Sequence, residues 1–453
     1  MAHQILVPFR GEGSGTAELT WAQRGIWRSI VHQGSSDFLG GVTRLPEGLA
    51  VAQVAESLSF VMGRHQSLRT RFAFDADGDP HQVLSDSGEV PLEIVEAGDA
   101  DPAELAEEIR VRYESTDFDY EHEWPLRMAV VCRQGEPVYS VAVYSHLAID
   151  AHGLNVLITD ISTMDPTRPV TALQPLAQAA RQARPSAQRQ TDSALRHWER
   201  VLRAAAPQRF GGSTDRREPR YWVMRYFSPA AERAMRLIAA RNGTDTSPVL
   251  LAAYAVALAR TAGNNPVVLQ IAVSNRFRPG FGESVSPLAQ ASPCLLDVAD
   301  VTFDEAVGRA VQAAMSTYLN AYYDPVLRAS LVAQVNEERG EEIELGCYFN
   351  DRREAERARD SEPVPSLAEI KAAVARSRLS RGPHSTVPQP PLYLDVDDAD
   401  DGIEFSMMAD THELSPADME AVLRTLEAVV VDAAKDGTVA TLVAGAHGER
   451  ASV

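Results

Sequence analysis

The stretch EPVYSVAVYSHLAIDAHGLNVLITDI, residues 136–161, determines how the first half of the chain folds. Its first part, EPVYSVAVYSH, is apolar on both faces, which is typical of a central β-strand. The segment LNVLITDI then has helical spacing, which places four apolar side chains on one face: Leu154, Leu157, Ile158 and Ile161. We therefore predict a strand, a turn that contains His146 and Asp150, and a helix.

His146 is a candidate general base because it ends an apolar strand. Buried apolar surroundings favour the neutral imidazole, which can accept a proton. Asp150 follows four residues later, but this spacing alone is compatible with two interpretations. His146 is either a catalytic base or a polar residue in a turn, with Asp150 as the N-cap of the following helix. The sequence contains no HExxH or similar ligand pair, so we expect no metal site.

Length and charge limit the possible classes of protein. A chain of 453 residues exceeds the usual size of a single core, so we expect two lobes of roughly 200 residues each. The formal net charge of -20 argues against nucleic acid or an anionic membrane as a partner. The N-terminal residues lack the apolar core of a signal peptide, and no apolar run approaches the roughly 20 residues of a membrane-spanning helix. We therefore expect a cytoplasmic protein.

Helices and strands alternate in both halves, which indicates an α/β protein. Residues 18–33 and 49–63 have helical spacing, and the second of these helices is expected to end at Gly63. In the second half we predict a long buried helix over 246–263 and a strand over 266–275. Residues 352–391 are first charged and then rich in proline, which favours a mobile insertion on the surface.

Several motifs, in order along the chain, resemble those of one enzyme family. SHLAIDAHG, residues 145–153, resembles the HHxxxDG signature of the condensation domains of nonribosomal peptide synthetases, which belong with the chloramphenicol acetyltransferase-like acyltransferases. GRHQSLRTRF, residues 63–72, is a nearly complete match to the family motif RHExLRTxF, and LTWAQRGIW, residues 19–27, is similar to the first motif. Further family segments are similar to VLQIAVSNRFRPG, QASPCLLDV and AYYDPVLRASL in the second half. The resemblance runs from Leu19 to Leu442.

The resemblance implies a fold as well as an activity. The expected fold is α/β, with two chloramphenicol acetyltransferase-like lobes arranged as a V-shaped pseudo-dimer around a central tunnel. Residues Met164 to Thr191 are rich in Pro, Gln and Ala, which is typical of a linker between lobes. We expect an N-terminal lobe over residues 1–175, a linker over residues 176–195 and a C-terminal lobe over residues 196–453.

The resemblance also assigns roles to individual residues. His146 corresponds to the second histidine of the signature, which accepts a proton from the attacking amine or hydroxyl, or orients it, at a thioester carbonyl. Asp150 corresponds to the motif aspartate, which turns away from the reaction and pairs with an arginine. Arg276 occupies the position of that arginine, so we expect an ion pair between the two lobes that holds the catalytic loop. His65 and Arg69 are expected to support the first lobe.

The chain departs from the family pattern at several positions near this signature. Ser145 replaces the first histidine, and Ala151 replaces a glycine, so the turn must be helical or slightly strained there. His152 stands where the family usually has tryptophan. The positions that we expect as possible lining of the tunnel are Ser145, His152, Gly153 and Gln290.

Three functional hypotheses follow from the resemblance. The first is a free-standing condensation enzyme of natural-product biosynthesis, which joins a thioester on a separate carrier protein to a small-molecule amine or alcohol. The second is an acyltransferase that uses coenzyme A, and the third is a catalytically silent scaffold that docks carrier proteins. We expect no cofactor of its own, because the substrate arrives as a phosphopantetheine or coenzyme A thioester. The arginines that could form a basic patch for either donor, or belong to a solvated loop, are Arg376, Arg378 and Arg381.

Overall fold

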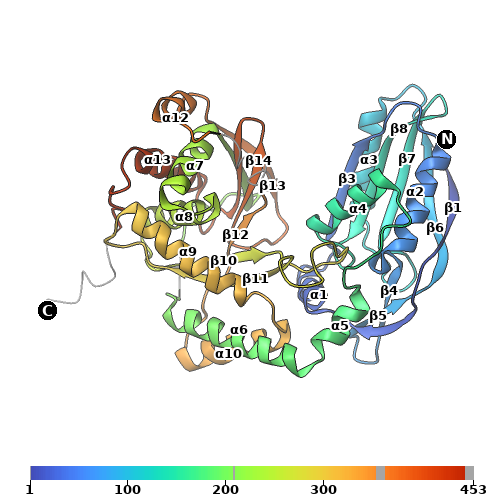
Figure 1. Ribbon diagram of the computed structural model, residues 1–453, viewed down its shortest axis with the longest axis horizontal. Helices are drawn as coiled ribbons and strands as arrows, with labels where there is room; N and C mark the ends of the chain where they lie inside the picture. The colour runs from blue at the N-terminus through green and yellow to red at the C-terminus, as the bar shows by residue number, and fades with distance from the viewer. Residues whose placement is uncertain (1, 208–209, 354–362, 444–453) are drawn as a thin grey trace. The chain divides into compact units, whose positions relative to one another are not determined.

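The computed structural model describes residues 2–207, 210–353 and 363–443 (Figure 1). The chain forms two compact units. Unit 1 consists of Met1–Gln190, Ser274–Gln290 and Asp324–Val326, and unit 2 consists of Thr191–Val273, Ala291–Tyr323 and Leu327–Val453, in both cases as far as these residues are described. The segment Ser274–Gln290 therefore belongs with unit 1, although we expected it in the C-terminal lobe.

The segment that we expected to be a linker is largely helical. Helix α5 (Pro175–Gln182) and helix α6 (Pro185–Ala204) cover most of residues 176–195. Both helices begin at a proline, where the fixed backbone angle and the missing N–H group are tolerated. Pro175 and Pro185, two of the prolines that suggested a linker, therefore mark the starts of helices.

Unit 1 contains a mixed five-stranded sheet in the order β1-β6-β7-β8-β3. Its strands are β1 (Ala2–Arg10), β6 (Ser87–Glu96), β7 (Leu126–Arg133), β8 (Glu136–Ser145) and β3 (Phe38–Arg44). Strand β8 pairs with β7 and β3, and both pairs are antiparallel. It therefore has a neighbour on each side, as the apolar pattern on both of its faces predicts. A second, three-stranded sheet comprises β2 (Gly15–Glu18), β5 (Pro80–Leu84) and β4 (Thr70–Phe74).

The helices of unit 1 follow the predicted spacing, with one corrected boundary. They are α1 (Trp21–Gln33), α2 (Val51–Arg64), α3 (Pro102–Glu114) and α4 (Ala151–Thr163), with a short 3-10 turn at Gln66–Arg69. Helix α2 extends past Gly63 and is followed by His65 in an extended conformation, so Gly63 does not end the helix. Glycine is needed there because a Cβ atom would lie 2.5 Å from the main-chain oxygen of Arg10 on β1.

Unit 2 contains a seven-stranded sheet in the order β11-β10-β12-β14-β15-β9-β13. The strands are β11 (Gln290–Leu296), β10 (Val267–Val273), β12 (Cys347–Asp351), β14 (Leu392–Ala399), β15 (Gly402–Asp410), β9 (Tyr221–Ser228) and β13 (Arg378–Ser385). Its helices include α7 (Pro229–Asn242), α8 (Thr246–Ala262), α9 (Phe303–Leu319), α10 (Pro325–Arg339), α12 (Leu367–Val374) and α13 (Pro416–Lys435).

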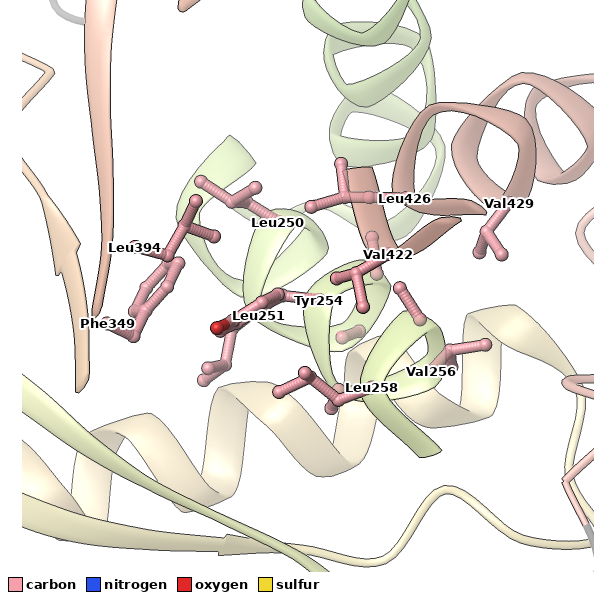
Figure 2. Close-up of a cluster of buried hydrophobic side chains, with 14 of the residues drawn as sticks. Leu250, Leu251, Tyr254, Val256, Leu258, Phe349, Leu394, Val422, Leu426 and Val429 are labelled. Carbon is pink, nitrogen blue, oxygen red and sulfur yellow. The ribbon is translucent and has the colours of Figure 1, made fainter. Parts of the chain in front are cut away.

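Helix α8 lies at the centre of unit 2, as its uniformly apolar sequence predicts. Figure 2 shows Leu250 and Tyr254 of α8 beside Phe349 and Leu394 of the sheet, with Val422 of α13 on another side of the helix. All five side chains are buried. The core of this unit therefore lies between one face of the sheet and helices α7, α8 and α13.

The expectation of a mobile insertion over residues 352–391 is wrong for the part that the structure describes. Residues 354–362 lie outside the described residues, but α12 and β13 lie within the segment. Helix α12 has a capping box formed by Ser366 and Glu369, a signal that is present in the sequence SLAE. Strand β13 is an edge strand that pairs with β9.

The three arginines of the expected basic patch lie on or next to β13, and a solvated loop is therefore not their setting. Arg376 forms an ion pair with Asp401. The other two cover aromatic rings of β9, with Arg378 lying 4.3 Å from the ring centre of Phe227. Within the described ranges, no helix is both long and apolar enough to cross a membrane.

Candidate active site

The candidate site of unit 1 lies in the turn between β8 and α4. The main-chain N–H of His146 donates to the carbonyl of Asp37, 2.9 Å away, and the His146 ring nitrogen Nδ1 lies 2.7 Å from the carbonyl oxygen of Ile149. Because a carbonyl only accepts, Nδ1 carries a proton, which leaves Nε2 as the ring nitrogen that can accept one. The His146 side chain is partly exposed while the three residues that follow it are buried. The turn therefore presents a proton acceptor.

Asp150 fills both roles that the sequence left open, as an N-cap and as the partner of an arginine. One carboxylate oxygen accepts the N–H of Gly153 at 2.8 Å and so caps α4. The other accepts the N–H of Leu288 at 3.0 Å. Arg276 forms an ion pair with the same carboxylate, and the two side chains are only 8% and 7% exposed for Asp150 and Arg276. This carboxylate thus connects α4 to the segment Ser274–Gln290.

Arg276 is held by main-chain carbonyls in addition to Asp150. It donates to the oxygen of Ser286 at 3.0 Å, to that of Phe281 at 3.2 Å and to that of Ser284. Burial lowers the pKa of the Arg276 guanidinium, and the negative charge of Asp150 opposes this effect. We expected an ion pair between two lobes, but both residues belong to unit 1, because the segment Ser274–Gln290 packs with this unit.

The two departures from the family signature fit the turn without strain. Ser145 is completely buried, and its hydroxyl accepts the N–H of Leu147 at 3.2 Å, so it supports the turn. Ala151 is the first residue of α4 and has no positive φ, in agreement with the expected helical turn. Nearby, the hydroxyl of Tyr120 donates to that of Ser36 at 3.0 Å, and burial raises the pKa of Tyr120.

The three other positions expected near a tunnel have different settings. His152 contacts the carbonyl of Gly282 through Nε2 at 3.1 Å. Gly153 is buried, and a Cβ atom there would lie 3.0 Å from the Ile149 side chain and 3.5 Å from the Cα of Val285. Both residues therefore pack α4 onto the segment Ser274–Gln290. Gln290 is the first residue of β11 and is partly exposed.

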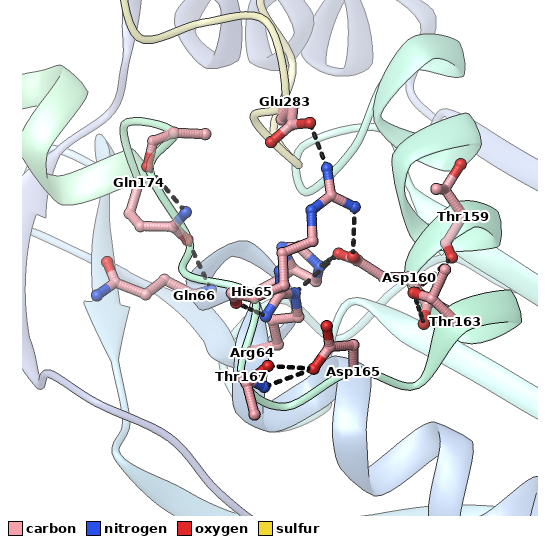
Figure 3. A network of polar contacts seen from close by, with 12 residues as sticks. Arg64, His65, Gln66, Thr159, Asp160, Thr163, Asp165, Thr167, Gln174 and Glu283 are labelled. Carbon is pink, nitrogen blue, oxygen red and sulfur yellow. Dashed lines mark hydrogen bonds and ion pairs between the residues drawn. The ribbon is translucent and has the colours of Figure 1, made fainter.

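A polar network that sequence reasoning missed holds the other end of α4 (Figure 3). Asp160 of α4 is buried, and one of its oxygens lies 2.9 Å from Nε2 of His65 and 2.9 Å from Nε of Arg64. Arg168 lies near the same carboxylate and forms an ion pair with Glu283. Burial lowers the pKa of His65, and the hydrogen bond that its ring donates to Asp160 opposes this effect. The motif residue His65 thus anchors α4.

The network also corrects the apolar face that we predicted for α4. Ile158 and Ile161 are 55% and 38% exposed, whereas Asp160 between them is buried with Leu157. The helix is thus turned toward its polar anchor. The sequence does show an acidic residue, Asp160, within this helix. An analysis of apolar periodicity, however, assigns a charged residue to the solvent-facing side.

Arg69 is the last residue of the 3-10 turn that leads into strand β4 of the three-stranded sheet. The resemblance implies a structural role for this residue. Its side chain is 1% exposed and donates to the carbonyls of Gly13 at 2.9 Å, of Ser85 at 2.5 Å and of Glu12. Burial lowers the pKa of this guanidinium. In the part of the chain that the structure describes, no group of three or more His, Cys, Asp or Glu side chains is arranged to hold a metal ion.

Comparison with known proteins assigns the family. The family model named "Condensation domain" matches residues 14–440. The chain belongs to the condensation-domain family. This condensation domain is 29% identical over 281 residues to the AMB antimetabolite synthetase AmbB of Pseudomonas aeruginosa, and the match covers 58% of the chain but 22% of AmbB. It is 25% identical to the phosphinothricin tripeptide synthetase PhsC of Streptomyces viridochromogenes, over 62% of the chain and 27% of PhsC. The matches thus span about a quarter of these relatives.

Solved structures show the same fold for this condensation domain. The X-domain from teicoplanin biosynthesis superimposes with a TM-score of 0.71 at 19% identity, over 96% of this chain and 99% of that one. The structure solved for condensation domain-mediated chain release from the enacyloxin polyketide synthase gives 0.69 at 22% identity, over 98% and 85% of the two chains. The α/β fold that the motifs imply is therefore confirmed.

Proposed function

We propose that this condensation domain catalyses the transfer of an acyl or aminoacyl group from a carrier-protein-bound phosphopantetheine thioester to an amine or hydroxyl of a small-molecule acceptor. The observation that carries the proposal is the hydrogen bonding of the two ring nitrogens of His146. Its Nδ1–H group is held by the Ile149 carbonyl, and no other described residue forms a hydrogen bond with Nε2. The family match and the synthetase relatives supply the class of substrate.

The chemistry needs one proton acceptor near the nucleophile. The acceptor amine or hydroxyl donates a hydrogen bond to Nε2 of His146 and attacks the thioester carbonyl, which forms the new C–N or C–O bond. The tetrahedral intermediate collapses, the C–S bond breaks, and the pantetheine thiolate leaves. The proton removed by His146 then passes to the thiolate, which restores the neutral imidazole. Because aminolysis of a thioester is downhill, placing the two reactants together contributes as much as base strength.

In this proposal Asp150 and Arg276 position the loop and do not touch the substrate. The carboxylate caps α4, binds Leu288 and pairs with Arg276, so the turn that carries His146 has a fixed end. Such a buried pair contributes geometry more than net stability, because desolvation of both charges offsets their attraction.

A second candidate function is that of a scaffold for a partner protein. It is favoured by one neighbour of the same fold, the X-domain from teicoplanin biosynthesis, which has been solved in complex with OxyB. The replacement of the first signature histidine by Ser145 is compatible with either function.

The test is transfer by the purified protein with a panel of acyl-carrier-protein and acyl-coenzyme A donors, with intact-mass detection of the product. We expect product with carrier-bound donors, and a loss of at least about a hundredfold in turnover for His146→Ala. His122→Ala is the matched control, because His122 is a 77% exposed histidine of the same unit, and it should keep the parent rate. A His146→Ala variant as fast as the parent would falsify the catalytic assignment. If product forms only from acyl-coenzyme A, coenzyme A takes the place of the carrier protein as the proposed donor. If no product forms although the carrier protein still binds, the scaffold function is favoured.

A further inference from the structure

The sheet of unit 2 has one face that is much less covered than the other. Figure 1 shows α7, α8 and α13 on one side of this sheet, and the side chains that point to them, such as Phe349, Leu394 and Phe405, are buried. Side chains alternate along a strand, so their neighbours point to the opposite face. On β12, β14, β15, β9 and β13 these neighbours are partly or fully exposed, whereas on β10 the same face is buried under α6 and α10, where Val268 packs in one cluster with Trp198. We call the exposed part on the five strands the open face.

The strand register places the side chains of the open face in rows. Residues directly opposite each other on neighbouring strands lie on the same face. The central row runs across β12, β14, β15, β9 and β13 through Asn350, Asp395, Ser406, Arg225 and Ser380. The row on one side contains Asp397, Glu404, Phe227 and Arg378, and the row on the other side contains Tyr348, Tyr393, Met408 and Val223.

Charges are separated across the open face. The carboxylates Asp395, Asp397 and Glu404 lie on β14 and β15, whereas Arg225 and Arg378 lie on β9 and β13. One cation balances the acidic side only in part. Arg352 binds Asp397 through two hydrogen bonds of 2.8 and 2.6 Å, which leaves the acidic half of the open face with an excess of negative charge.

Asp395 is the carboxylate of this half that is best placed to receive a ligand. One of its oxygens accepts a hydrogen bond from the Asn350 amide at 2.8 Å and lies 3.5 Å from Arg352. For its other oxygen, no described residue provides a hydrogen-bond donor. The Asp395 side chain is 24% exposed, so the carboxylate is recessed but reachable. Burial raises its pKa, although Arg352 and Asn350 oppose the rise.

Two aromatic rings form the surface beside this carboxylate. Tyr348 and Tyr393 stack with ring centres 5.4 Å apart and an interplanar angle of 15°. They occupy the row next to Asn350 and Asp395 on the same two strands. An aliphatic chain that ends in an ammonium group matches this surface, because its methylene groups can pack on the rings while its charge reaches the carboxylate.

We propose that the open face binds an aminoacyl group with a basic side chain, and that Asp395 recognises its ammonium group. The inference rests on the proposed function for the kind of ligand, an aminoacyl group on a pantetheine arm. The ammonium bound at Asp395 is not the nucleophile, because a protonated amine has no lone pair. Asp395 therefore determines specificity and is not a catalytic residue. The net charge of -20 of the whole chain also favours a cationic ligand.

The test compares two stable amide analogues of the pantetheine thioester, one with N-acetyl-lysine and one with N-acetyl-norleucine, which differ in the ammonium group. Their dissociation constants are measured by calorimetry on the full chain. We expect the parent to bind the lysine analogue about tenfold more tightly, the size of one charge-assisted hydrogen bond. Asp395→Asn should bind both analogues equally. Asp432→Asn, which removes the same charge from an exposed site on α13, should keep the preference.

A second variant keeps the test decisive if Asp395→Asn does not fold. Ser406 lies opposite Asp395 in the central row. In Ser406→Lys, the new ammonium group would form an ion pair with the Asp395 carboxylate and so block the binding of a ligand there. This variant should also lose the preference for the lysine analogue. No preference in the parent, or an unchanged preference in the folded variants, would overturn the inference.

Failure of this inference can be distinguished from failure of the proposed function. His146→Ala should keep the binding preference, because the analogues do not react and His146 belongs to unit 1. Transfer that depends on His146, together with equal binding of the two analogues, would overturn the specificity site alone. A preference that depends on Asp395 in a protein without transfer activity would overturn the proposed reaction alone.

Discussion

One main-chain contact determines which ring nitrogen of His146 is left to accept a hydrogen bond. The Ile149 carbonyl, three residues away, fixes the proton on Nδ1, so the orientation of the ring is encoded in the turn itself. Catalytic histidines are often oriented by a carboxylate, but Asp150 here points to Arg276 and Leu288. The carboxylate of the signature therefore determines the position of the loop, and the carbonyl determines the tautomer of the histidine.

The Asp150 carboxylate should be the most sensitive group in this loop. In Asp150→Ala, Arg276 stays buried without a counter-ion, which costs roughly 3–5 kcal/mol, and the cap of α4 is lost at about 1 kcal/mol. We expect the melting temperature to fall by at least about 6 °C, as measured by calorimetry.

The matched control for this variant is Asp165→Ala. Asp165 also accepts a hydrogen bond from a main-chain N–H, that of Thr167, but it is exposed and, among the described residues, it forms no ion pair. Its replacement should change the melting temperature by less than about 2 °C, as for other exposed substitutions. Equal effects of the two substitutions would show that the pair with Arg276 does not hold the loop.

The elements around the candidate site could be predicted from the sequence because their signals are local. The strand Glu136–Ser145 and the helix Ala151–Thr163 follow from apolar periodicity, and the turn between them follows from the family signature. The buried face of this helix could not be predicted, since Asp160 is held by His65, a partner 95 positions away. Edge strand β13 was missed because its sequence, RLSRGPHS, is polar, with a Pro and a Gly that are typical of loops.

The contact of helix α2 with strand β1 depends on Gly63. In Gly63→Ala, the new methyl group would lie 2.5 Å from the main-chain oxygen of Arg10, and neither backbone can move freely because both elements belong to the core. We expect a loss of roughly 1–3 kcal/mol in the free energy of unfolding, measured with urea.

Gly25→Ala is the matched control for the contact of α2 with β1. Gly25 lies inside helix α1, and a Cβ atom there would meet no other atom within 4 Å. Alanine should therefore stabilise the protein by about 0.5–1 kcal/mol, because it loses less conformational freedom than glycine. If both substitutions stabilise the protein, the close approach of α2 to β1 is not what requires glycine at position 63.

At the scale of the whole molecule, the division into units was the least predictable feature. The segment Ser274–Gln290 follows strand β10 of unit 2 in the chain, yet it packs with unit 1 through Arg276, Glu283 and Leu288. Composition gave no signal for this, because the contacts are two long-range ion pairs and a hydrogen bond from the main-chain N–H of Leu288. The family resemblance did identify Arg276 as the partner of Asp150, which periodicity alone does not show.

Among the described residues, each unit buries one histidine with a lowered pKa, and this couples the stability of the chain to pH. Burial lowers the pKa of His65 in unit 1 and of His197 in unit 2 from the ordinary value of 6.5. The His197 ring also bonds the Pro293 carbonyl through Nε2 at 2.7 Å. As the pH falls below about 6.5, the unfolded chain takes up protons at these positions and the folded chain does not, so the free energy of unfolding decreases.

Thermal stability should therefore be lower at pH 5.5 than at pH 7.5, and this difference should shrink in His65→Gln, in His197→Gln and most of all in the double variant. The lowered pKa of Asp160 acts only below its ordinary value of 3.8, outside this range, and the raised pKa of Asp395 acts in the opposite direction, so neither produces the expected loss. His122→Gln, at a 77% exposed position, should keep the full difference. The measurement is the melting temperature of each variant at the two pH values. A double variant with the same pH dependence as the parent would show that neither buried histidine causes the loss of stability.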